Sequence, residues 1–70
     1  MTKTGKIEWF NNKIGSGLIT DCEGRKIEVQ NNDIITDGLK TLFKGDIVLY
    51  TLRKVNEKLC AKQVILCIRD

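Results

Sequence analysis

Histidine is missing from the 70-residue sequence, and aromatic residues are scarce, with one Trp, one Tyr and two Phe. Without histidine the chain lacks the commonest general base and the commonest metal ligand. No nucleophile motif or pair of carboxylates in a recognisable frame is present. Gly15-Ser16-Gly17 is too short for a Walker loop and lacks its Gly-Lys-Ser/Thr ending. We therefore expect no enzyme, no catalytic residues, no metal site and no cofactor.

Long hydrophobic runs are absent as well. Uncharged apolar segments such as residues 47–50 are too short to cross a bilayer, and residues 1–5 lack the apolar core of a signal peptide. Cys22, Cys60 and Cys67 form no C-x-x-C pair and have no histidine to complete a zinc site. We expect three reduced cysteines in a cytoplasmic protein without membrane contact.

The length and charge limit the architecture and the partners. Seventy residues suffice for one small domain, residues 1–70, and a chain of this size buries only about 60% of its unfolded surface, which favours closed folds. The net charge of +3 permits binding to a polyanion without requiring it. The basic residues cluster in two regions of the sequence, namely Lys3, Lys6, Lys13, Arg25 and Lys26, and later Arg53, Lys54, Lys58 and Lys62.

Alternation of apolar and polar residues predicts five strands. They are expected over Lys6–Phe10, Ser16–Asp21, Lys26–Gln30, Ile47–Leu52 and Leu59–Ile68, with Ile7, Ile19, Ile27, Val29, Val48, Tyr50 and Leu52 facing inward. Residues 31–45 break the alternation, and we expect a short helical turn over Asp33–Thr36 that ends at Gly38. Five short strands with one longer connection favour an all-β barrel over an open sheet, whose edges would stay exposed.

The segment Trp9–Ile19 is the strongest candidate for a binding site. It contains two adjacent aromatic residues, the polar turn Asn11-Asn12-Lys13 and glycines at positions 15 and 17. A flat ligand or another backbone can approach closely where a side chain is missing, so this spacing is compatible with a ligand. A bulge or a barrel corner explains the glycines equally well.

These segments resemble the cold-shock domain family. Residues 5–11, Gly-Lys-Ile-Glu-Trp-Phe-Asn, are similar to its opening Gly-x-Val-Lys-Trp-Phe-Asn pattern. Residues 14–19 fall on its first RNA-binding motif, Lys-Gly-Phe-Gly-Phe-Ile, and residues 27–31 on the second, Val-Phe-Val-His-Phe. Residues 37–42 and 61–64 match its Asp-Gly-Tyr-Lys-Ser-Leu and Ala-x-Asn-Val segments. The resemblance implies a five-stranded antiparallel OB-type barrel that binds single-stranded RNA or DNA, as an RNA chaperone or transcriptional regulator of the bacterial kind.

The resemblance also implies a set of ligand-binding residues. Trp9 and Phe10 would stack on bases, Lys13 and Lys62 would meet phosphates, and Gln30 with Asn31 would read base edges. The full expected set is Trp9, Phe10, Asn11, Lys13, Gly15, Ser16, Gly17, Leu18, Gln30, Asn31 and Lys62. For each residue the alternative is a structural role, such as a rim tryptophan, a packing phenylalanine or a solvated turn.

This chain departs from the family pattern on the ligand face. Ser16, Leu18, Glu28, Gln30, Asn31 and Leu39 stand where the family usually has aromatic residues or histidine, and Glu8 replaces a lysine. Stacking contributes about 1–3 kcal/mol per base, so losing about three stacks costs about 3–9 kcal/mol. We therefore expect weak binding, micromolar or poorer, with a steep dependence on salt.

The fourth strand suggests a different use of the barrel. With Val48 and Tyr50 facing inward, Ile47 and Leu49 face outward, and Ile65 can join them on the last strand. Adjacent outward aliphatic residues form a surface for a homodimer through the Ile47/Leu49 strand face or for another protein partner. The rival hypothesis is a barrel that has lost nucleic-acid binding and acts in protein contacts.

Overall fold

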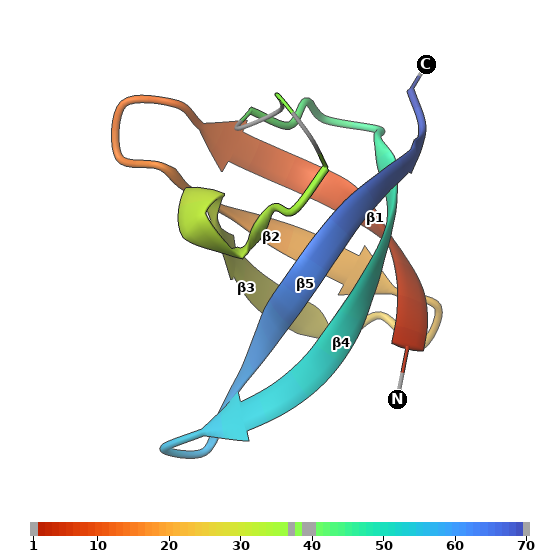
Figure 1. Cartoon of the computed structure of the whole chain (residues 1–70). Coiled ribbons are helices and arrows are strands. Elements are labelled where there is room, and N and C mark those ends of the chain that lie inside the picture. The colour runs from red at the N-terminus through yellow and green to blue at the C-terminus, as the bar shows by residue number, and fades with distance from the viewer. Residues whose placement is uncertain (1, 37, 39–40, 70) are drawn as a thin grey trace.

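The computed structural model describes residues 2–36, 38 and 41–69. It contains five strands, β1 (Thr2–Asn11), β2 (Ser16–Asp21), β3 (Lys26–Gln30), β4 (Ile47–Val55) and β5 (Lys58–Ile68), and one 3₁₀ turn, η1 (Asn31–Asp33). The strands close into a barrel in the order β1-β2-β3-β5-β4 (Figure 1). The predicted all-β barrel is therefore confirmed.

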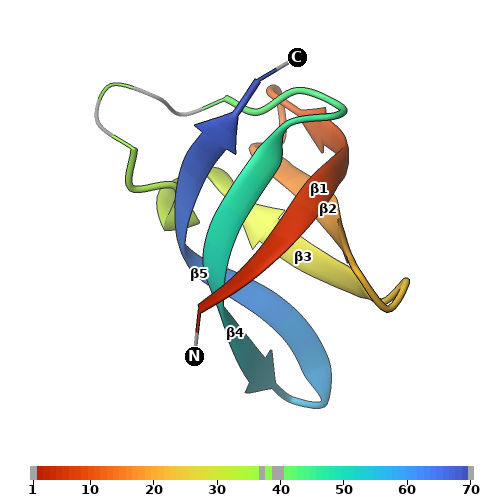
Figure 2. The ribbon, with the colours of Figure 1, turned by 90° about the vertical axis from the view of Figure 1, so that its right-hand side faces the viewer.

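One seam of the barrel differs from the expected antiparallel arrangement. The pairs β1–β2, β2–β3, β1–β4 and β4–β5 run antiparallel, and Figure 2 shows β4 lying between β1 and β5. In contrast, β3 pairs with β5 in parallel, with Glu28 opposite Cys60. A ring with an odd number of strands cannot alternate direction all the way round, so a closed five-stranded barrel needs such a pair.

The interior of the barrel is a single apolar cluster. The buried hydrophobic residues are Ile7, Ile19, Ile27, Val29, Ile34, Leu42, Val48, Tyr50, Ala61 and Val64, each with at most 1% of its surface exposed. All the predicted inward residues belong to this list except Leu52, which is partly buried and packs against it. Side chains that alternate along the strands thus meet in one core, as the two-residue period of a strand requires.

A bulge in β1 lets Ile7 and Trp9 face opposite sides although they are two residues apart. Ile7 pairs with Ile19 on β2, whereas Trp9 pairs with the very next residue of β2, Leu18, so that Glu8 is an extra residue in the ladder. After such an insertion, the residues that would have faced inward face outward, and the reverse. Accordingly, Ile7 is 1% exposed and Trp9 is 42% exposed. The Trp9 indole therefore faces outward, and the bulge is the cause.

The connection between β3 and β4 differs from the expected helical turn. The 3₁₀ turn lies at Asn31–Asp33 rather than at Asp33–Thr36, and the Gln30 backbone N–H donates to Asp33 Oδ2 at 3.3 Å. Ile34 is already extended and forms a parallel bridge with Val64, which ends the turn early. Leu39, which stands where the family usually has an aromatic residue or histidine, lies outside the described residues.

An ion pair between a buried carboxylate and a partly exposed arginine links the end of β5 to the start of β4. The Asp46 carboxylate, in a residue 1% exposed, accepts hydrogen bonds from Arg69 Nε at 3.3 Å and from the Phe43 backbone N–H at 2.9 Å. The Arg69 guanidinium also lies 4.8 Å from the centre of the Phe43 ring. Because a buried charge needs a partner, Arg69 compensates Asp46 and holds the chain end in place.

Candidate nucleic-acid interface

The outward side chains of β1, β2 and β3 form one surface, which we call the outer face. The register of the three strands aligns these side chains in rows that cross the sheet. The two rows nearest the β1–β2 turn are Trp9, Leu18 and Glu28, followed by Asn11, Ser16 and Gln30. Residues from both motifs, far apart in the sequence, therefore share one surface.

Trp9 is the only large aromatic side chain of this surface among the described residues. With 42% of its area exposed beside the partly buried Leu18, its ring can contact a ligand and also rests on the sheet. An indole with an exposed face offers a stacking surface to any base, because every base has a π-face. Phe10 is half-buried and packs against the core.

The β1–β2 turn uses its asparagine internally. Asn11 Oδ1 accepts the backbone N–H of Lys13 at 2.9 Å and of Ile14 at 3.3 Å, and the Asn11 carbonyl accepts the Gly15 N–H at 2.8 Å. The side chain of Asn11 therefore stabilises the turn. Lys13 is exposed near the tip of this turn and makes no ion pair within the part of the chain that the structure describes.

The space beside the two glycines is filled by the chain itself. A Cβ built on Gly17 would lie 2.4 Å from the Trp9 carbonyl oxygen and 2.7 Å from Phe10 Cδ2, and Gly17 is buried. A Cβ on Gly15, whose φ is +67°, would lie 2.7 Å from the Asn31 side chain. The expected approach of a ligand to these positions is thus replaced by close packing of Phe10 and Asn31.

Glu8, Thr20 and Lys26 form a hydrogen-bonded group on the outer face, which the sequence did not reveal. Lys26 Nζ is ion-paired with Glu8 Oε2 and lies 3.1 Å from Thr20 Oγ1, which donates to the same carboxylate at 2.8 Å. The hydrogen bonds from Lys26 and Thr20, together with the charge of Lys44, lower the pKa of Glu8 below its usual value. Glu8 is thus paired with a cation rather than left as an isolated repulsive charge.

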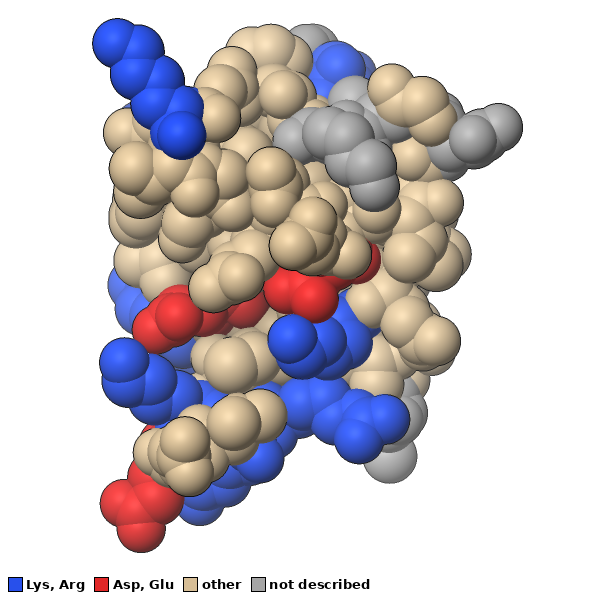
Figure 3. All heavy atoms as spheres, turned by 60° about the vertical axis from the view of Figure 1, so that its left-hand side comes forward, with Lys and Arg blue, Asp and Glu red and all other residues tan. Residues whose placement is uncertain are grey.

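Two further lysines beside the outer face are paired with carboxylates. Lys58 Nζ lies 3.8 Å from Glu28 Oε2, and Lys62 Nζ lies 3.2 Å from Asp33 Oδ1. Figure 3 shows Lys and Arg gathered in the lower part of this side of the molecule, with carboxylates above them and a largely uncharged surface higher up. A phosphate approaching Lys58 or Lys62 would compete with a carboxylate already in place.

The predicted residues therefore separate into two groups. Trp9, Leu18, Ser16, Gln30 and Lys62 lie on or beside the outer face. Those that support the face from within, or build its turns, are Phe10, Asn11, Lys13, Gly15, Gly17 and Asn31.

Over residues 2–36, 38 and 41–69, no group of three or more His, Cys, Asp or Glu side chains is placed to hold a metal ion. Within the same residues, no helix has the length and apolarity needed to cross a membrane. Cys22, Cys60 and Cys67 carry free thiols.

The chain is similar in sequence to bacterial cold shock proteins. The chain is 38% identical over 65 residues to the major cold shock protein CspA of Bacillus cereus, covering 93% of this chain and 97% of that protein. It is 44% identical over 48 residues to cold shock protein 2 of Lactiplantibacillus plantarum, covering 69% and 73% of the two chains.

A solved structure and a family profile complete the comparison. The structure described as drosophila Unr CSD456 has a TM-score of 0.80 at 14% identity and covers 97% of this chain and 27% of that one, which supports the fold alone. The profile of the family described as "'Cold-shock' DNA-binding domain" matches residues 3–67. The chain therefore belongs to the cold-shock domain family.

Proposed function

We propose that this protein binds single-stranded RNA or DNA on the outer face of β1–β3, with little base preference. Nucleic-acid binding of the cold-shock type follows from membership of the family. The choice of face rests on one observation, the exposed indole of Trp9 beside Leu18 on a surface flanked by lysines. Stacking on a single indole does not distinguish strongly between bases, so the binding is largely independent of sequence.

The affinity is micromolar or weaker for two physical reasons. The neighbours of Trp9 in the rows of the outer face, such as Leu18 and Ser16, cannot stack, and each missing stack costs about 1–3 kcal/mol. In addition, Lys58 and Lys62 already pair with carboxylates, so a phosphate gains only the difference between two ion pairs.

The residues of the proposed site have different roles. Trp9 stacks on a base, Lys13 and Lys62 contact phosphates, and the exposed Gln30 amide offers hydrogen bonds to base edges. Leu18 and Ser16 provide the surface on which the strand lies. Phe10, Asn11, Gly15, Gly17 and Asn31 act indirectly, because they hold the β1–β2 turn and the end of β3 in position.

In the cell, such a protein acts as an RNA chaperone or a transcriptional regulator in the cytoplasm. Weak, sequence-independent binding suits a chaperone, since it must release each strand after contact. We propose that a single domain over residues 1–70 carries this function by binding alone, without catalysis.

A fluorescence titration tests the proposal, because Trp9 is the chain's only tryptophan and reports directly from the site. Oligo-U and oligo-dT are added at several salt concentrations. We expect quenching with a micromolar or weaker dissociation constant that rises with salt, by a slope of about 0.7 per phosphate contact on a log–log plot. An unchanged signal at millimolar oligonucleotide at low salt would refute it.

A second proposal concerns self-association through the Ile47/Leu49 face. Leu49 and Ile65 are paired across β4 and β5, and Ile65 is 41% exposed, whereas Ile47 and Leu49 are partly buried. This small aliphatic surface supports a homodimer at high concentration. Light scattering at high and low concentration tests it, since a mass of one chain throughout would exclude the dimer.

A further inference from the structure

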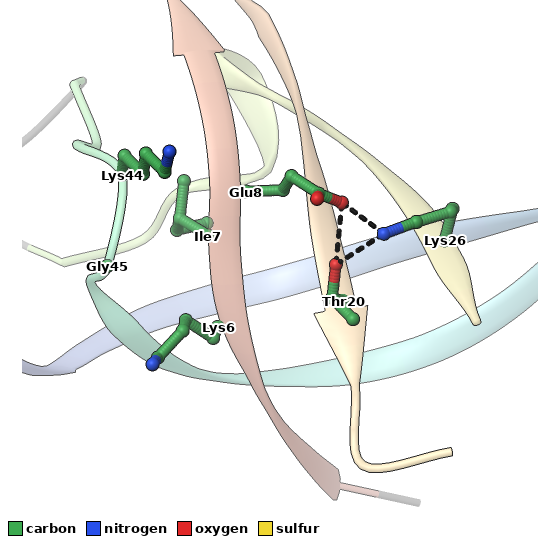
Figure 4. A pocket seen from close by; sticks show the side chains of 7 residues that line it. All are labelled: Lys6, Ile7, Glu8, Thr20, Lys26, Lys44 and Gly45. Atoms are coloured by element: carbon green, nitrogen blue, oxygen red, sulfur yellow. Dashed lines mark hydrogen bonds and ion pairs between the residues drawn. The ribbon is translucent and has the colours of Figure 1, made fainter. Parts of the chain in front are cut away.

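A groove with three lysines lies beside the site described above. It has a volume of about 330 Å³ and is open at the surface next to the bulge of β1 (Figure 4). Its lining residues are Lys6, Ile7, Glu8, Thr20, Lys26, Lys44 and Gly45. The groove therefore combines residues of β1, β2 and β3 with the segment that precedes β4, and none of its lining residues belongs to the predicted site.

The groove has an excess of positive charge. Its lining contains three ammonium groups and one carboxylate, which leaves two positive charges uncompensated (3 − 1). Lys26 is the lysine paired with Glu8, whereas Lys6 and Lys44 make no ion pair with any described residue. An anion entering the groove can thus be bound by Lys6 and Lys44 without displacing a carboxylate from them.

The donors available in the groove suit a phosphate better than a base. The Ile7 backbone N–H donates to the Asp46 carbonyl at 2.8 Å, and the Gly45 N–H donates to the Ile7 carbonyl at 2.9 Å. Because these backbone groups are occupied and Lys26 is paired with Glu8, the ammonium groups of Lys6 and Lys44 are left to bind an anion. An ammonium is a compact point charge with no acceptor, so it attracts anions without reading the donor and acceptor pattern of a base.

The groove is close enough to Trp9 to take part in binding the same strand. Glu8 directly precedes Trp9, and Thr20 lies two residues from Leu18 on the outer side of β2, a spacing of about 7 Å. A strand with one base stacked on Trp9 can continue along the sheet past Thr20, which brings a neighbouring phosphate over the groove.

We propose that Lys6 and Lys44 form a phosphate-binding subsite for the strand whose base stacks on Trp9, and that Glu8 limits its strength by holding Lys26. This inference rests on the proposed function. It places a phosphate contact at lysines that make no ion pair with a described residue, whereas Lys58 and Lys62 are paired with carboxylates.

The test compares single charge changes by the Trp9 titration with oligo-dT. We expect Lys44→Gln and Lys6→Gln each to weaken binding about twofold to fivefold, the range for an exposed ionic contact. Each should also reduce the log–log salt slope by about 0.7. Glu8→Gln should strengthen binding about twofold to fivefold, because it frees Lys26. Lys54→Gln, an equal charge loss on β4 away from the groove, is the control and should leave the slope unchanged.

The outcomes separate this inference from the proposed function. If the wild-type protein binds and the groove variants behave like Lys54→Gln, the subsite is wrong while the function stands. If the wild-type protein does not bind at all, the function itself fails. Inorganic phosphate distinguishes a strand from a free phosphate as the ligand. Suppose that phosphate binds the wild-type protein and no longer binds Lys44→Gln, while both proteins bind oligo-dT with the same affinity. The groove would then be a site for free phosphate, and the proposed strand subsite would be wrong.

Discussion

The inside and the outside of β1–β3 are built by alternate residues of the same strands, yet they differ in how they are stabilised. Inside, Ile7, Ile19 and Ile27 are paired across the sheet and are almost fully buried. Burial of each such side chain stabilises the fold by about 1.5–3 kcal/mol, whatever its partners. The contribution of the interior to stability therefore depends on the apolar surface and the volume of each buried side chain.

Outside, the side chains adjacent to these isoleucines are Glu8, Thr20 and Lys26, and they interact through an ion pair and hydrogen bonds. An exposed pair of this kind contributes about 0–1 kcal/mol. In the proposed site its importance is for the ligand, since the pair determines whether Lys26 is free to contact a phosphate. Under this proposal, alternate residues of the same strands carry stability and binding.

The neighbouring residues Ile19 and Leu18 of β2 give the sharpest test of this division between residues for stability and residues for binding. We expect Ile19→Ala to lower the free energy of unfolding by about 2–5 kcal/mol, because it leaves a cavity in a fully buried position. Leu18→Ala, on the partly exposed side, should cost clearly less and should weaken oligonucleotide binding instead. Urea unfolding followed by circular dichroism measures both, and equal losses would contradict the division.

The ion pair between the buried Asp46 and the partly exposed Arg69 should contribute to stability, as the apolar interior does, although it is charged. We expect Arg69→Met to cost about 2–4 kcal/mol of unfolding free energy, somewhat below the ~3–5 kcal/mol of a fully buried pair, because the Arg69 side chain is 37% exposed. The double variant with Asp46→Asn should recover part of the loss, since no buried charge then remains unpaired. Urea unfolding of the two single variants and the double variant measures this coupling, and strictly additive losses would show that the pair does not interact.

Restoring an aromatic residue on the outer face should change binding and leave stability nearly unaffected. Leu18→Phe places a second ring beside Trp9, in the row where the family motif has phenylalanine. We expect oligo-dT affinity to rise by about 1–3 kcal/mol, or about fivefold to a hundredfold. Isothermal titration calorimetry measures the gain, with Leu18→Ile as the matched control. An unchanged affinity would show that a strand does not cross this row.

The smallest effect concerns the pH dependence of stability. Hydrogen bonds from Lys26 and Thr20, with the charge of Lys44, lower the pKa of Glu8 in the folded protein. A carboxyl group with a lowered folded pKa adds stability above its unfolded pKa, and this stability is lost as the pH falls through the folded pKa. We expect Glu8→Gln to flatten the acid limb of the stability curve slightly below about pH 4.5. Urea midpoints measured from pH 7 to pH 3 check it, and a steeper acid limb would contradict the sign.

The fold could be predicted largely because its core follows a strict two-residue alternation. The bounds of β2 and β3 were predicted as Ser16–Asp21 and Lys26–Gln30, the same bounds that the structure has. β1 extends further than predicted, to Thr2, because its first residues pair with β4 up to Thr51. That extension depends on a partner strand distant in sequence, which a local pattern does not contain.

The site was less predictable, because its chemistry depends on register. Lys26 and Glu8 are 18 residues apart and meet through pairing across β2 and the bulge at Glu8. The alternation of apolar and polar residues in the sequence predicts neither the bulge nor the groove that Lys6 and Lys44 border. The family resemblance pointed to the residues around Trp9, while the ion pair of Lys26, and the lack of one with any described residue at Lys6 and Lys44 beside them, required the structure.

Amide chemical shifts of the ¹⁵N-labelled protein, titrated with oligo-dT at low salt, test the central claim most directly. We expect the chemical-shift changes to be concentrated in the outward rows around Trp9 and Leu18, including the indole N–H of Trp9. These changes should diminish as salt is added. We expect little change at Leu49 and Ile65 on β4 and β5. Shifts confined to the Leu49 and Ile65 side, with an unchanged Trp9 indole, would place the binding surface elsewhere and contradict the account.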